Sequence, residues 1–253
     1  MKKIEELEKL REMLEYLELP KMLESFLALY KEPRYAEMDK MDFLEEIVTP
    51  EYEYKYNQRL QRDLRLGSLS FREGDYDSLF THDGRCYNEN TLKQVKNFTW
   101  AETGKNVCVF GQSGVGKSYF LVGMGIEACK MGIKTLYMDY NQLKDELVYL
   151  KGNDTPKYYK RLKHYSNIPL LLIDDFLSES TSPEALSILF QLIRERDVRN
   201  HSTMVGSQYD PSEWVQLLTG NNNVKGEADS FRRRLVQKGY LITITVEEPG
   251  SEN

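Results

Sequence analysis

One stretch of the chain has the residue types and the spacing that bind phosphate. An apolar run at residues 107–110 leads into Gly111-x-x-x-x-Gly116-Lys117-Ser118, and a helical apolar pattern follows. Glycines let the backbone close around a triphosphate with its N–H groups pointing inward, while the lysine adds a positive charge. The start of the helix adds a partial positive charge, and a serine hydroxyl there suits Mg²⁺. The predicted nucleotide-binding residues are Gly111, Gln112, Ser113, Gly114, Val115, Gly116, Lys117, Ser118 and Tyr119.

Two adjacent carboxylates end a second apolar run. Residues 169–173 are Pro-Leu-Leu-Leu-Ile, and Asp174 and Asp175 follow directly. A pair of acids at a strand end is often only a cap for the next turn, but after a phosphate loop the pair indicates nucleotide hydrolysis. We expect Asp174, together with Ser118, to hold Mg²⁺, and Asp175 to orient or deprotonate the attacking water. The predicted cofactors are therefore ATP and Mg²⁺.

Two later segments supply further candidates. The apolar run at residues 202–206 ends in Ser207 and Gln208, where a polar side chain can sense the γ-phosphate. We favour Gln208, against the alternative of ordinary polar residues at a strand end. A helical segment then carries Arg232, Arg233 and Arg234. An arginine there cannot easily reach its own nucleotide, but Arg234 could stabilise the transition-state charge in the site of a neighbouring subunit.

The elements that position these residues alternate along the second half of the chain. The predicted strands cover residues 106–110, 133–138, 169–174, 202–207 and 240–247. The predicted helices cover residues 117–131, 140–150, 155–165, 183–199, 210–218 and 226–237. Such alternation favours an α/β fold whose five-stranded parallel sheet is covered on both faces. Ligands in such folds bind at the carboxyl ends of the strands, where the two acids and Gln208 are expected.

The first third of the chain has a different pattern. Residues 4–30 show two acidic amphipathic segments with Pro20 opening the second, and a third helical segment covers residues 41–66. Turn residues make the stretch from 67 to 87 irregular. We therefore divide the chain into an N-terminal helical domain at 1–66, a linker and start of the ATPase module at 67–104, and an ATP-binding domain at 105–253.

Composition limits the setting in which the protein works. No apolar run is long enough to span a membrane, and the charged start is not a secretory signal, so we expect a cytoplasmic protein without membrane contact. The 3 cysteines and 3 histidines lack metal-ligand spacing, so no structural metal is expected. The net charge of −6 does not exclude nucleic acid, because the acidic residues concentrate in the N-terminal helices and the last few residues.

The order of these motifs resembles the IstB-like transposition helper ATPases, which are relatives of the DnaC-type helicase loaders in the initiator clade of AAA+ proteins. The resemblance covers residues 8–246 and depends on the phosphate loop, on Leu171-Leu-Ile-Asp-Asp, on Gly206-Ser-Gln and on Arg234-Leu-Val. Family members often carry a threonine where this chain has Gly206. Only about six residues follow the last predicted strand, so the C-terminal helical lid of typical AAA+ modules is expected to be absent, as it is in this family.

The resemblance implies a function. The chain would form an ATP-dependent ring or spiral of identical subunits on DNA, with Arg234 acting on the next subunit, and would help or stimulate a transposase. The alternative is a loader of a replicative helicase, which shares the same ATPase. A metabolic kinase with a phosphate loop is a third hypothesis, but it gives the sensor strand and Arg234 no role.

The most basic stretch of the chain lies between the two nucleotide motifs. In the initiator clade this region holds an extra helix that faces the central channel of the assembly. Its predicted phosphate contacts are Lys157, Lys160, Arg161 and Lys163. Arg59 and Arg62 are further candidates, since the spacing of cations there puts them on one helix face. We expect sequence-independent contacts with DNA, with duplex favoured and single strands left open by the neighbouring tyrosines. A solvated helix face is the alternative for both segments.

Overall fold

The computed structural model describes residues 2–70, 72–80, 85–219, 225–237 and 239–246. The chain divides into two compact units, Met1–Arg62 and Asp63–Asn253. Among the helices of the described residues, none is both long and apolar enough to cross a membrane. The predicted absence of a C-terminal lid concerns residues after 246, which lie outside the described part of the chain.

The first unit is helical, as the spacing of its apolar residues predicts. It contains α1 (Lys2–Tyr16), α2 (Pro20–Leu29), the 3₁₀ turn η1 (Pro33–Ala36) and most of α3 (Lys40–Leu66). Its small core is built from Phe26, Leu29 and Ile47. Partly buried apolar residues of the same unit pack against this core, and a helix cap adds a polar contact.

Glu51 of α3 caps the start of α2. Its side chain is only 5% exposed, and Oε2 accepts hydrogen bonds from the backbone N–H groups of Lys21 (2.7 Å) and Met22 (3.0 Å). Pro20 opens the helix and has no N–H to satisfy. A carboxylate at a helix N-terminus meets unpaired donors and the positive end of the helix dipole. Glu51 therefore joins two helices of this unit by electrostatic as well as apolar contact.

The second unit is built around a twisted sheet of six strands in the order β1-β6-β2-β5-β4-β3. The strands are β1 (Arg85–Tyr87), β2 (Val107–Phe110), β3 (Thr135–Asp139), β4 (Leu170–Phe176), β5 (Ser202–Ser207) and β6 (Tyr240–Val246). The five strands from β2 to β6 are the predicted ones, and they pair in parallel. The predicted five-stranded parallel sheet is thus confirmed, and β1 adds an antiparallel edge strand to β6 that the sequence pattern did not predict.

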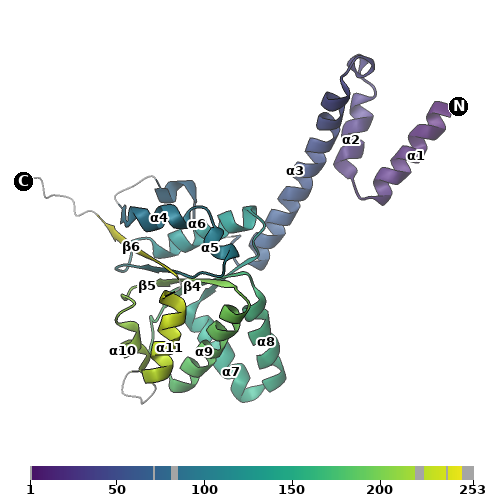
Figure 1. Ribbon diagram of the computed structural model, residues 1–253. Helices are drawn as coiled ribbons and strands as arrows, with labels where there is room; N and C mark the ends of the chain where they lie inside the picture. Colours follow the sequence, from purple (N-terminus) through teal and green to yellow (C-terminus); the bar gives the residue numbers. More distant parts are fainter. Residues whose placement is uncertain (1, 71, 81–84, 220–224, 238, 247–253) are drawn as a thin grey trace, which may run out of the picture. The chain divides into compact units, whose positions relative to one another are not determined.

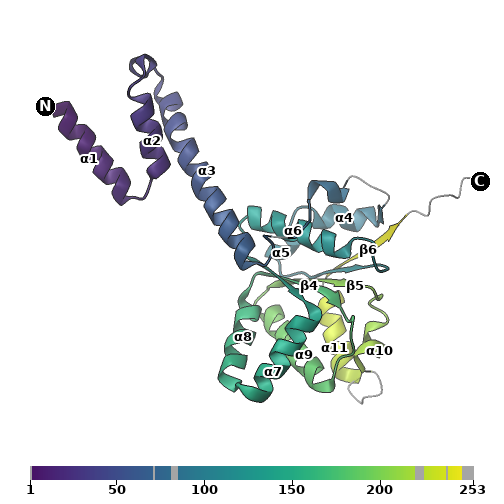
Figure 2. The same ribbon diagram turned by 180° about the vertical axis from the view of Figure 1, so that it is seen from behind.

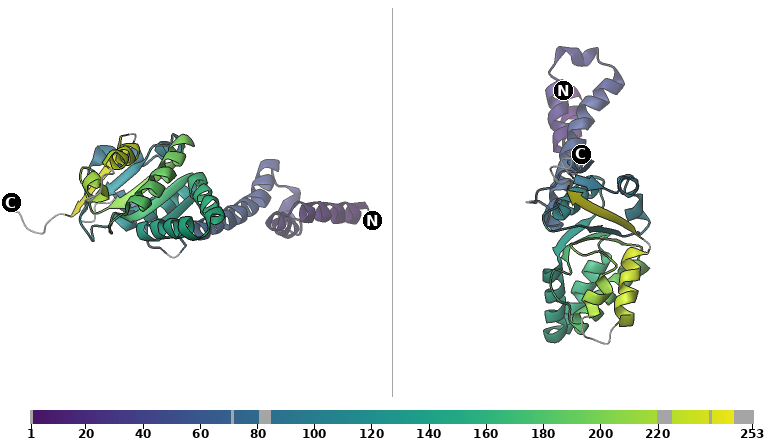
Figure 3. Two further views of the ribbon diagram at one scale, coloured as in Figure 1. Left: turned by 90° about the horizontal axis from the view of Figure 1, so that it is seen from below. Right: turned by 90° about the vertical axis from the view of Figure 1, so that its left-hand side faces the viewer.

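Helices cover both faces of this sheet, as Figures 1 and 2 show. One face carries α4 (Glu89–Val95), α5 (Thr99–Glu102) and α6 (Lys117–Lys130). The opposite face carries α7 (Tyr140–Asn153), α8 (Thr155–Asn167), α9 (Pro183–Val198), α10 (Trp214–Thr219) and α11 (Lys225–Val236). Views from below and from the side confirm the layered α/β arrangement (Figure 3). Strands buried on both faces explain why these segments read as continuous apolar runs.

The segment from 67 to 104 is an integral part of the second unit. Besides β1, α4 and α5 it holds the 3₁₀ turn η2 (Asp77–Phe80). Its buried side chains include Leu69, Leu79, Leu92, Val95 and Trp100. The irregular sequence pattern indicates a linker, whereas the structure assigns these buried residues to the second unit.

A buried arginine holds part of the second face together. Arg196 of α9 is 1% exposed. Its guanidinium donates to the backbone oxygens of Tyr165 (2.6 Å) and Ile168 (2.8 Å) at the end of α8. It also donates to Thr203 Oγ1 (3.0 Å) and to the backbone oxygen of Ser202 at the start of β5. Burial lowers the pKa of Arg196 to about 9, so the side chain is charged at neutral pH.

Candidate nucleotide-binding site

The phosphate loop connects the end of β2 to the start of α6. Gly114 and Gly116 have φ angles of +82° and +99°, which L side chains rarely adopt. A Cβ on Gly116 would also lie 2.9 Å from Nε of Arg85. Gly116 is the N-cap residue of α6. The loop therefore has a backbone conformation that requires glycine at these two positions. It leads directly into the first turn of α6, where backbone N–H groups without an intrahelical partner can bind an anion.

Lys117 lies inside this loop and is only 7% exposed. Its Nζ donates to the backbone oxygens of Gly111 (2.9 Å) and Gln112 (2.8 Å). An ammonium group has three donors, so one remains for a phosphate oxygen. Burial lowers the pKa of Lys117, while Asp175 and Asp174 act in the opposite direction. The lysine thus shapes the loop and keeps a cationic donor at its centre.

The two acids lie at a bulge at the end of β4. Ile173 pairs with Val205 and Phe176 pairs with Ser207, so the two acids stand opposite a single residue of β5. Asp174 is 2% exposed, whereas Asp175 is exposed and has φ +51°. The bulge therefore gives two neighbouring carboxylates different environments. Such a difference suits a division of labour between a cation ligand and a general base.

The residue opposite the bulge is Gly206, and the structure explains why this position lacks a side chain. A Cβ on Gly206 would lie 2.8 Å from Oδ1 of Asp174 and 3.3 Å from Cδ1 of Leu121. A buried carboxylate oxygen cannot easily give way, because it also accepts a hydrogen bond from the N–H of Asp175 at 3.0 Å. Gly206 thus leaves the space that Oδ1 of Asp174 occupies.

Charges around the acids also couple them. Although Asp175 is exposed as a residue, partial desolvation of its carboxyl is the first cause that raises its pKa; the negative charges of Asp174 and Asp139 raise it further, and Lys117 lowers it. A carboxylate with increased proton affinity is a better base toward water than a free aspartate. The arrangement can therefore accept a proton next to the phosphate loop.

The residues present fit Mg²⁺ that arrives with a nucleotide. Ser118 is exposed in the first turn of α6, and Asp174 lies at the end of β4. Within the described ranges there is no group of three or more His, Cys, Asp or Glu side chains that could hold a metal ion. Because Mg²⁺ takes six oxygen ligands, the remaining ones would come from phosphate and water.

The structure separates the two sensor candidates at the end of β5. The Ser207 hydroxyl is buried and donates to the backbone oxygen of Phe176 at 2.8 Å. It also accepts a hydrogen bond from the N–H of Tyr209 at 3.2 Å. Gln208 is exposed next to it. The preference for Gln208 stays a prediction, but Ser207 is now seen to stabilise the strand end.

The three arginines of α11 differ in their contacts. Arg232 and Arg233 both bind Asp229, at 3.2 and 3.1 Å. Arg234 donates to Ser230 Oγ at 2.7 Å, and its guanidinium lies 5.0 Å from the centre of the Phe190 ring. In the part of the chain that the structure describes, its buried Nε has no hydrogen-bond partner. Arg234 is therefore the member of the three without a carboxylate partner.

The basic stretch between the nucleotide motifs forms α8, whose opposite side is buried. Tyr158, Leu162 and Tyr165 face the core. The exposed residues include the four predicted phosphate contacts Lys157, Lys160, Arg161 and Lys163. Lys157 binds Asp154 at 2.8 Å, and Arg161 binds Glu146 at 2.7 Å.

The other two predicted DNA contacts lie in the first unit. Arg59 is on α3 with its guanidinium 5.0 Å from the centre of the Tyr56 ring, and Arg62 is exposed on the same helix. Each has a further interaction within the structure. Since α8 belongs to the second unit, the six predicted contacts fall into two separate groups.

Two residues beside the site were not identified from the sequence. Tyr137 of β3 donates its hydroxyl to Oδ2 of Asp174. Arg85 of β1 lies against Gly116, with its guanidinium 5.5 Å from the centre of the Tyr119 ring. Tyr137 lies in a predicted strand of the sheet, so the sequence could have indicated that it lies near the strand that ends at Asp174. Arg85 lies in the irregular segment and gave no signal.

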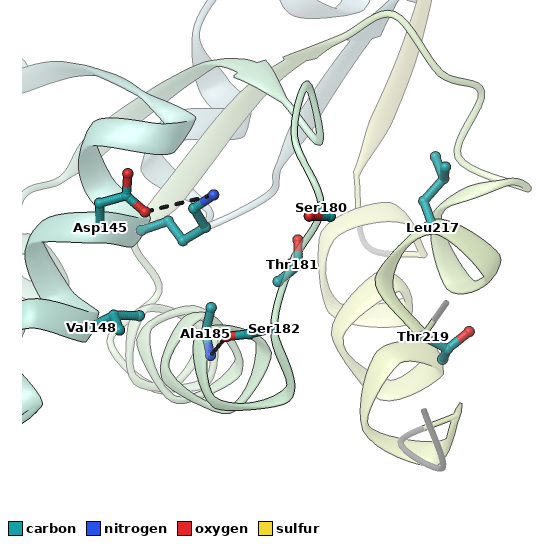
Figure 4. Close-up of a pocket in the computed structure, with 9 residues that line it drawn as sticks. Asp145, Val148, Ser180, Thr181, Ser182, Ala185, Leu217 and Thr219 are labelled. Carbon is teal, nitrogen blue, oxygen red and sulfur yellow. Dashed lines mark hydrogen bonds and ion pairs between the residues drawn. The ribbon is translucent and has the colours of Figure 1, made fainter. Parts of the chain in front are cut away.

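A surface pocket of about 480 Å³ lies away from these residues, on the face covered by α7 and α10. Figure 4 shows Asp145 and Val148 on α7, Leu217 and Thr219 on α10, and a connecting turn that carries Ser180. The amine of Lys144, which also lines the pocket, is held by Glu179 at 3.4 Å and Asp145 at 3.6 Å. None of the predicted site residues lines this pocket.

The parallel sheet, the phosphate loop and the paired acids define an α/β protein of the class that binds nucleotides at a phosphate loop. The chain belongs to the family described as IstB-like ATP binding protein, which matches residues 12–247.

Relatives from bacterial insertion sequences agree with this assignment. The insertion sequence ATP-binding protein y4pL of Sinorhizobium fredii is 24% identical over 226 residues, which is 89% of each chain. The ATP-binding protein of insertion sequence IS5376 from Geobacillus stearothermophilus is 23% identical, with 91% of this chain and 97% of that protein covered.

Solved structures show the same fold. DnaI superimposes with a TM-score of 0.59 at 23% identity, and the match covers 69% of this chain and 92% of that one. The replication initiator DnaA, bound to AMPPCP and single-stranded DNA, gives a TM-score of 0.56 at 18% identity over 68% of this chain and 50% of that one. At these identities the likeness concerns the fold alone.

Proposed function

We propose that this chain is an ATPase that assembles with copies of itself on DNA and stimulates a partner transposase. The proposal rests on one observation. The phosphate loop and the paired acids both lie at the carboxyl ends of parallel strands, the loop after β2 and the acids at the end of β4. The names of the relatives support the transposase, because they tie those proteins to insertion sequences. The DNA in the DnaA structure is compatible with a nucleic-acid partner for this fold.

The reaction is the attack of water on the γ-phosphate of ATP, which yields ADP and phosphate. The loop N–H groups and the free donor of Lys117 bind the phosphates, and Asp175 takes the proton from the attacking water. Gln208 contacts the γ-phosphate from the end of β5. Mg²⁺, held through Ser118 and Asp174, supplies charge neutralisation for the phosphates when it is bound.

A second subunit would contribute to the reaction by supplying its Arg234 to the active site of its neighbour. Catalysis of phosphoryl transfer gains most from positive charge placed where negative charge develops, and an arginine supplied by another subunit is one such device. Arg234 is held by its own helix through Ser230 and not by an acid. Its guanidinium can therefore leave these neutral contacts at lower cost than Arg232 and Arg233 can leave Asp229.

Replacing Arg234 with alanine is expected to abolish ATP-dependent assembly on DNA and to lower ATP turnover by about 10³-fold or more, the range for arginines supplied in trans. The measurement is sedimentation with a fluorescent 60-base-pair duplex in ATP, in ADP and without nucleotide, together with phosphate release. Wild type should form large complexes only with ATP. Binding of a fluorescent ATP analogue to the isolated R234A subunit should stay at the wild-type level.

Two variants serve as controls for this experiment. Lys117→Ala should lose nucleotide binding itself, and Arg233→Ala, whose exposed side chain binds Asp229, should behave as wild type. Assembly of R234A that equals wild type would rule out the shared site. A wild-type chain that stays monomeric on duplex DNA and binds a hexameric helicase would favour the helicase loader.

Removing Lys160 and Lys163 together should weaken DNA binding equally for unrelated sequences. Each lost phosphate contact reduces the slope of log K against log salt by about 0.9 on duplex and about 0.7 on single strands. The two lysines therefore account for about 1.8 units of slope on duplex. The measurement is fluorescence anisotropy across a salt series, with duplex and single-stranded probes side by side.

The matched control is Lys93→Ala on α4, which is exposed, binds Glu89 at 3.5 Å and lies on the other face of the sheet. Its slope should equal that of wild type. An unchanged slope in the K160A/K163A variant would show that the exposed side of α8 is only a solvated helix face.

A further inference from the structure

The carboxylate of Asp174 is held on both of its oxygens. Oδ2 accepts the hydroxyl of Tyr137, and Oδ1 accepts the N–H of Asp175 at 3.0 Å. Gly206 leaves just enough room beside Oδ1. The side chain is 2% exposed, so water cannot replace these partners. The orientation of the carboxylate plane is thus set in part by Tyr137, which lies outside the known motifs.

Tyr137 is itself fixed by three contacts. It lies on β3, where its strand neighbour on β4 is Leu172, two residues before Asp174. Its N–H donates to the backbone oxygen of Gly67 at 2.9 Å. The guanidinium of Arg72 lies 3.8 Å from the ring centre, close enough for a cation–π contact. The ring therefore cannot swing away from Asp174 without losing contacts on its far side.

Arg72 is anchored in turn by the segment that follows α3. Its Nε donates to the backbone oxygen of Ser68 at 2.9 Å. The Tyr137 hydroxyl is the donor of its contact with Asp174, because a carboxylate oxygen only accepts. One chain of contacts thus runs from Gly67, Ser68 and Arg72 through Tyr137 to Asp174.

We infer that Tyr137 is a positioning residue for Asp174, and that Arg72 holds its ring in place. The hydroxyl holds the carboxylate plane in the orientation that a cation arriving with the nucleotide would meet. This inference rests on the proposed ATP hydrolysis at the same site. Groups that orient a metal-binding side chain in this way are typically worth 10- to 100-fold in metal affinity or activity.

The test compares Tyr137→Phe with wild type. A fluorescent ATP analogue is titrated first in EDTA and then at fixed nucleotide with increasing Mg²⁺. The affinity of Y137F for the ATP analogue in EDTA should match that of wild type within about twofold. The Mg²⁺ concentration that gives half of the full signal change should rise about 10- to 100-fold. ATP turnover should return toward wild type at high Mg²⁺, because the variant loses orientation and not the carboxylate.

The control is Tyr140→Phe, three residues further on. It also removes a buried tyrosine hydroxyl, but one that is paired with Thr181. A merely structural role of the hydroxyl predicts similar effects of the two variants on melting temperature and no change in Mg²⁺ dependence. If Y137F folds poorly, Arg72→Ala replaces it, because Arg72 is exposed and its side chain reaches the site through the Tyr137 ring, its other contact being the nearby backbone oxygen of Ser68. It should shift the Mg²⁺ dependence in the same direction by a smaller factor.

The outcomes separate the inference from the proposed function. Wild-type Mg²⁺ dependence in Y137F, or in R72A where Y137F does not fold, overturns the positioning role and leaves the ATPase intact. A wild-type chain without any Mg²⁺-dependent nucleotide binding overturns both. The inference is supported if Y137F and R72A need more Mg²⁺ for the half-maximal effect and Y140F needs as much as wild type.

Discussion

Asp175→Asn should lower ATP turnover by about 10²- to 10⁴-fold, the range that a general base contributes. Asparagine has nearly the same shape but cannot take the proton from the attacking water. Binding of ATP should persist, since Lys117 and the loop N–H groups remain in place. The measurement is phosphate release at saturating ATP, with affinity followed by a fluorescent ATP analogue.

Asp139→Asn provides the matched control for this variant. Asp139 is another acid near the site, but its Oδ1 caps α7 by accepting from the N–H groups of Asn141 (2.9 Å) and Gln142 (3.0 Å). Asparagine caps a helix about as well as aspartate. Turnover should therefore stay at the wild-type order of magnitude. If ATP turnover of D175N stays within a few-fold of the wild-type value, Asp175 is not the general base.

The second large effect concerns stability. Arg196→Met keeps much of the apolar stem but leaves the oxygens of Tyr165, Ile168, Ser202 and Thr203 without their donor. Breaking such a buried network costs about 3–5 kcal/mol. For a unit of this size, that loss corresponds to a fall in melting temperature of about 6–20 °C. Calorimetry on the full chain at pH 7 measures it.

Arg199→Met is the comparison that isolates burial. Arg199 lies one turn later at the exposed end of α9 and binds Asn167 and Glu195. Exposed contacts of this kind contribute little, so its effect should stay within about 0.5 kcal/mol. Equal melting temperatures for R196M and R199M would mean that the buried guanidinium adds nothing to stability.

The parts of the fold that the sequence predicts are those with local signals. The strand at residues 170–173 is an unbroken apolar run, and α8 shows Tyr158, Leu162 and Tyr165 at helical spacing. The phosphate loop is a contiguous motif, so its residues could be named one by one. The predicted start of α10 at 210 is four residues early, because Asp210 accepts from the N–H of Ser212 and closes a turn first.

The parts that it does not predict depend on contacts between distant segments. Strand β1 is three residues long and exists because it pairs with β6, far along the chain. Tyr137 meets Asp174 only because β3 and β4 are neighbours in the sheet. Neither fact has a signature within a window of ten residues. The role of Gly206 is of the same kind, since only the approach of Asp174 explains it.

The contacts of Arg196 also constrain how the module can move. They join the end of α8 to the start of β5, the strand whose other end carries Gln208. Sliding α8 along the sheet would break several buried hydrogen bonds at once, so α8 and β5 are expected to move together. A movement caused by nucleotide would then carry the lysines of α8 along with β5. In a helical assembly, the pitch between subunits would set how far apart these charges fall along the DNA.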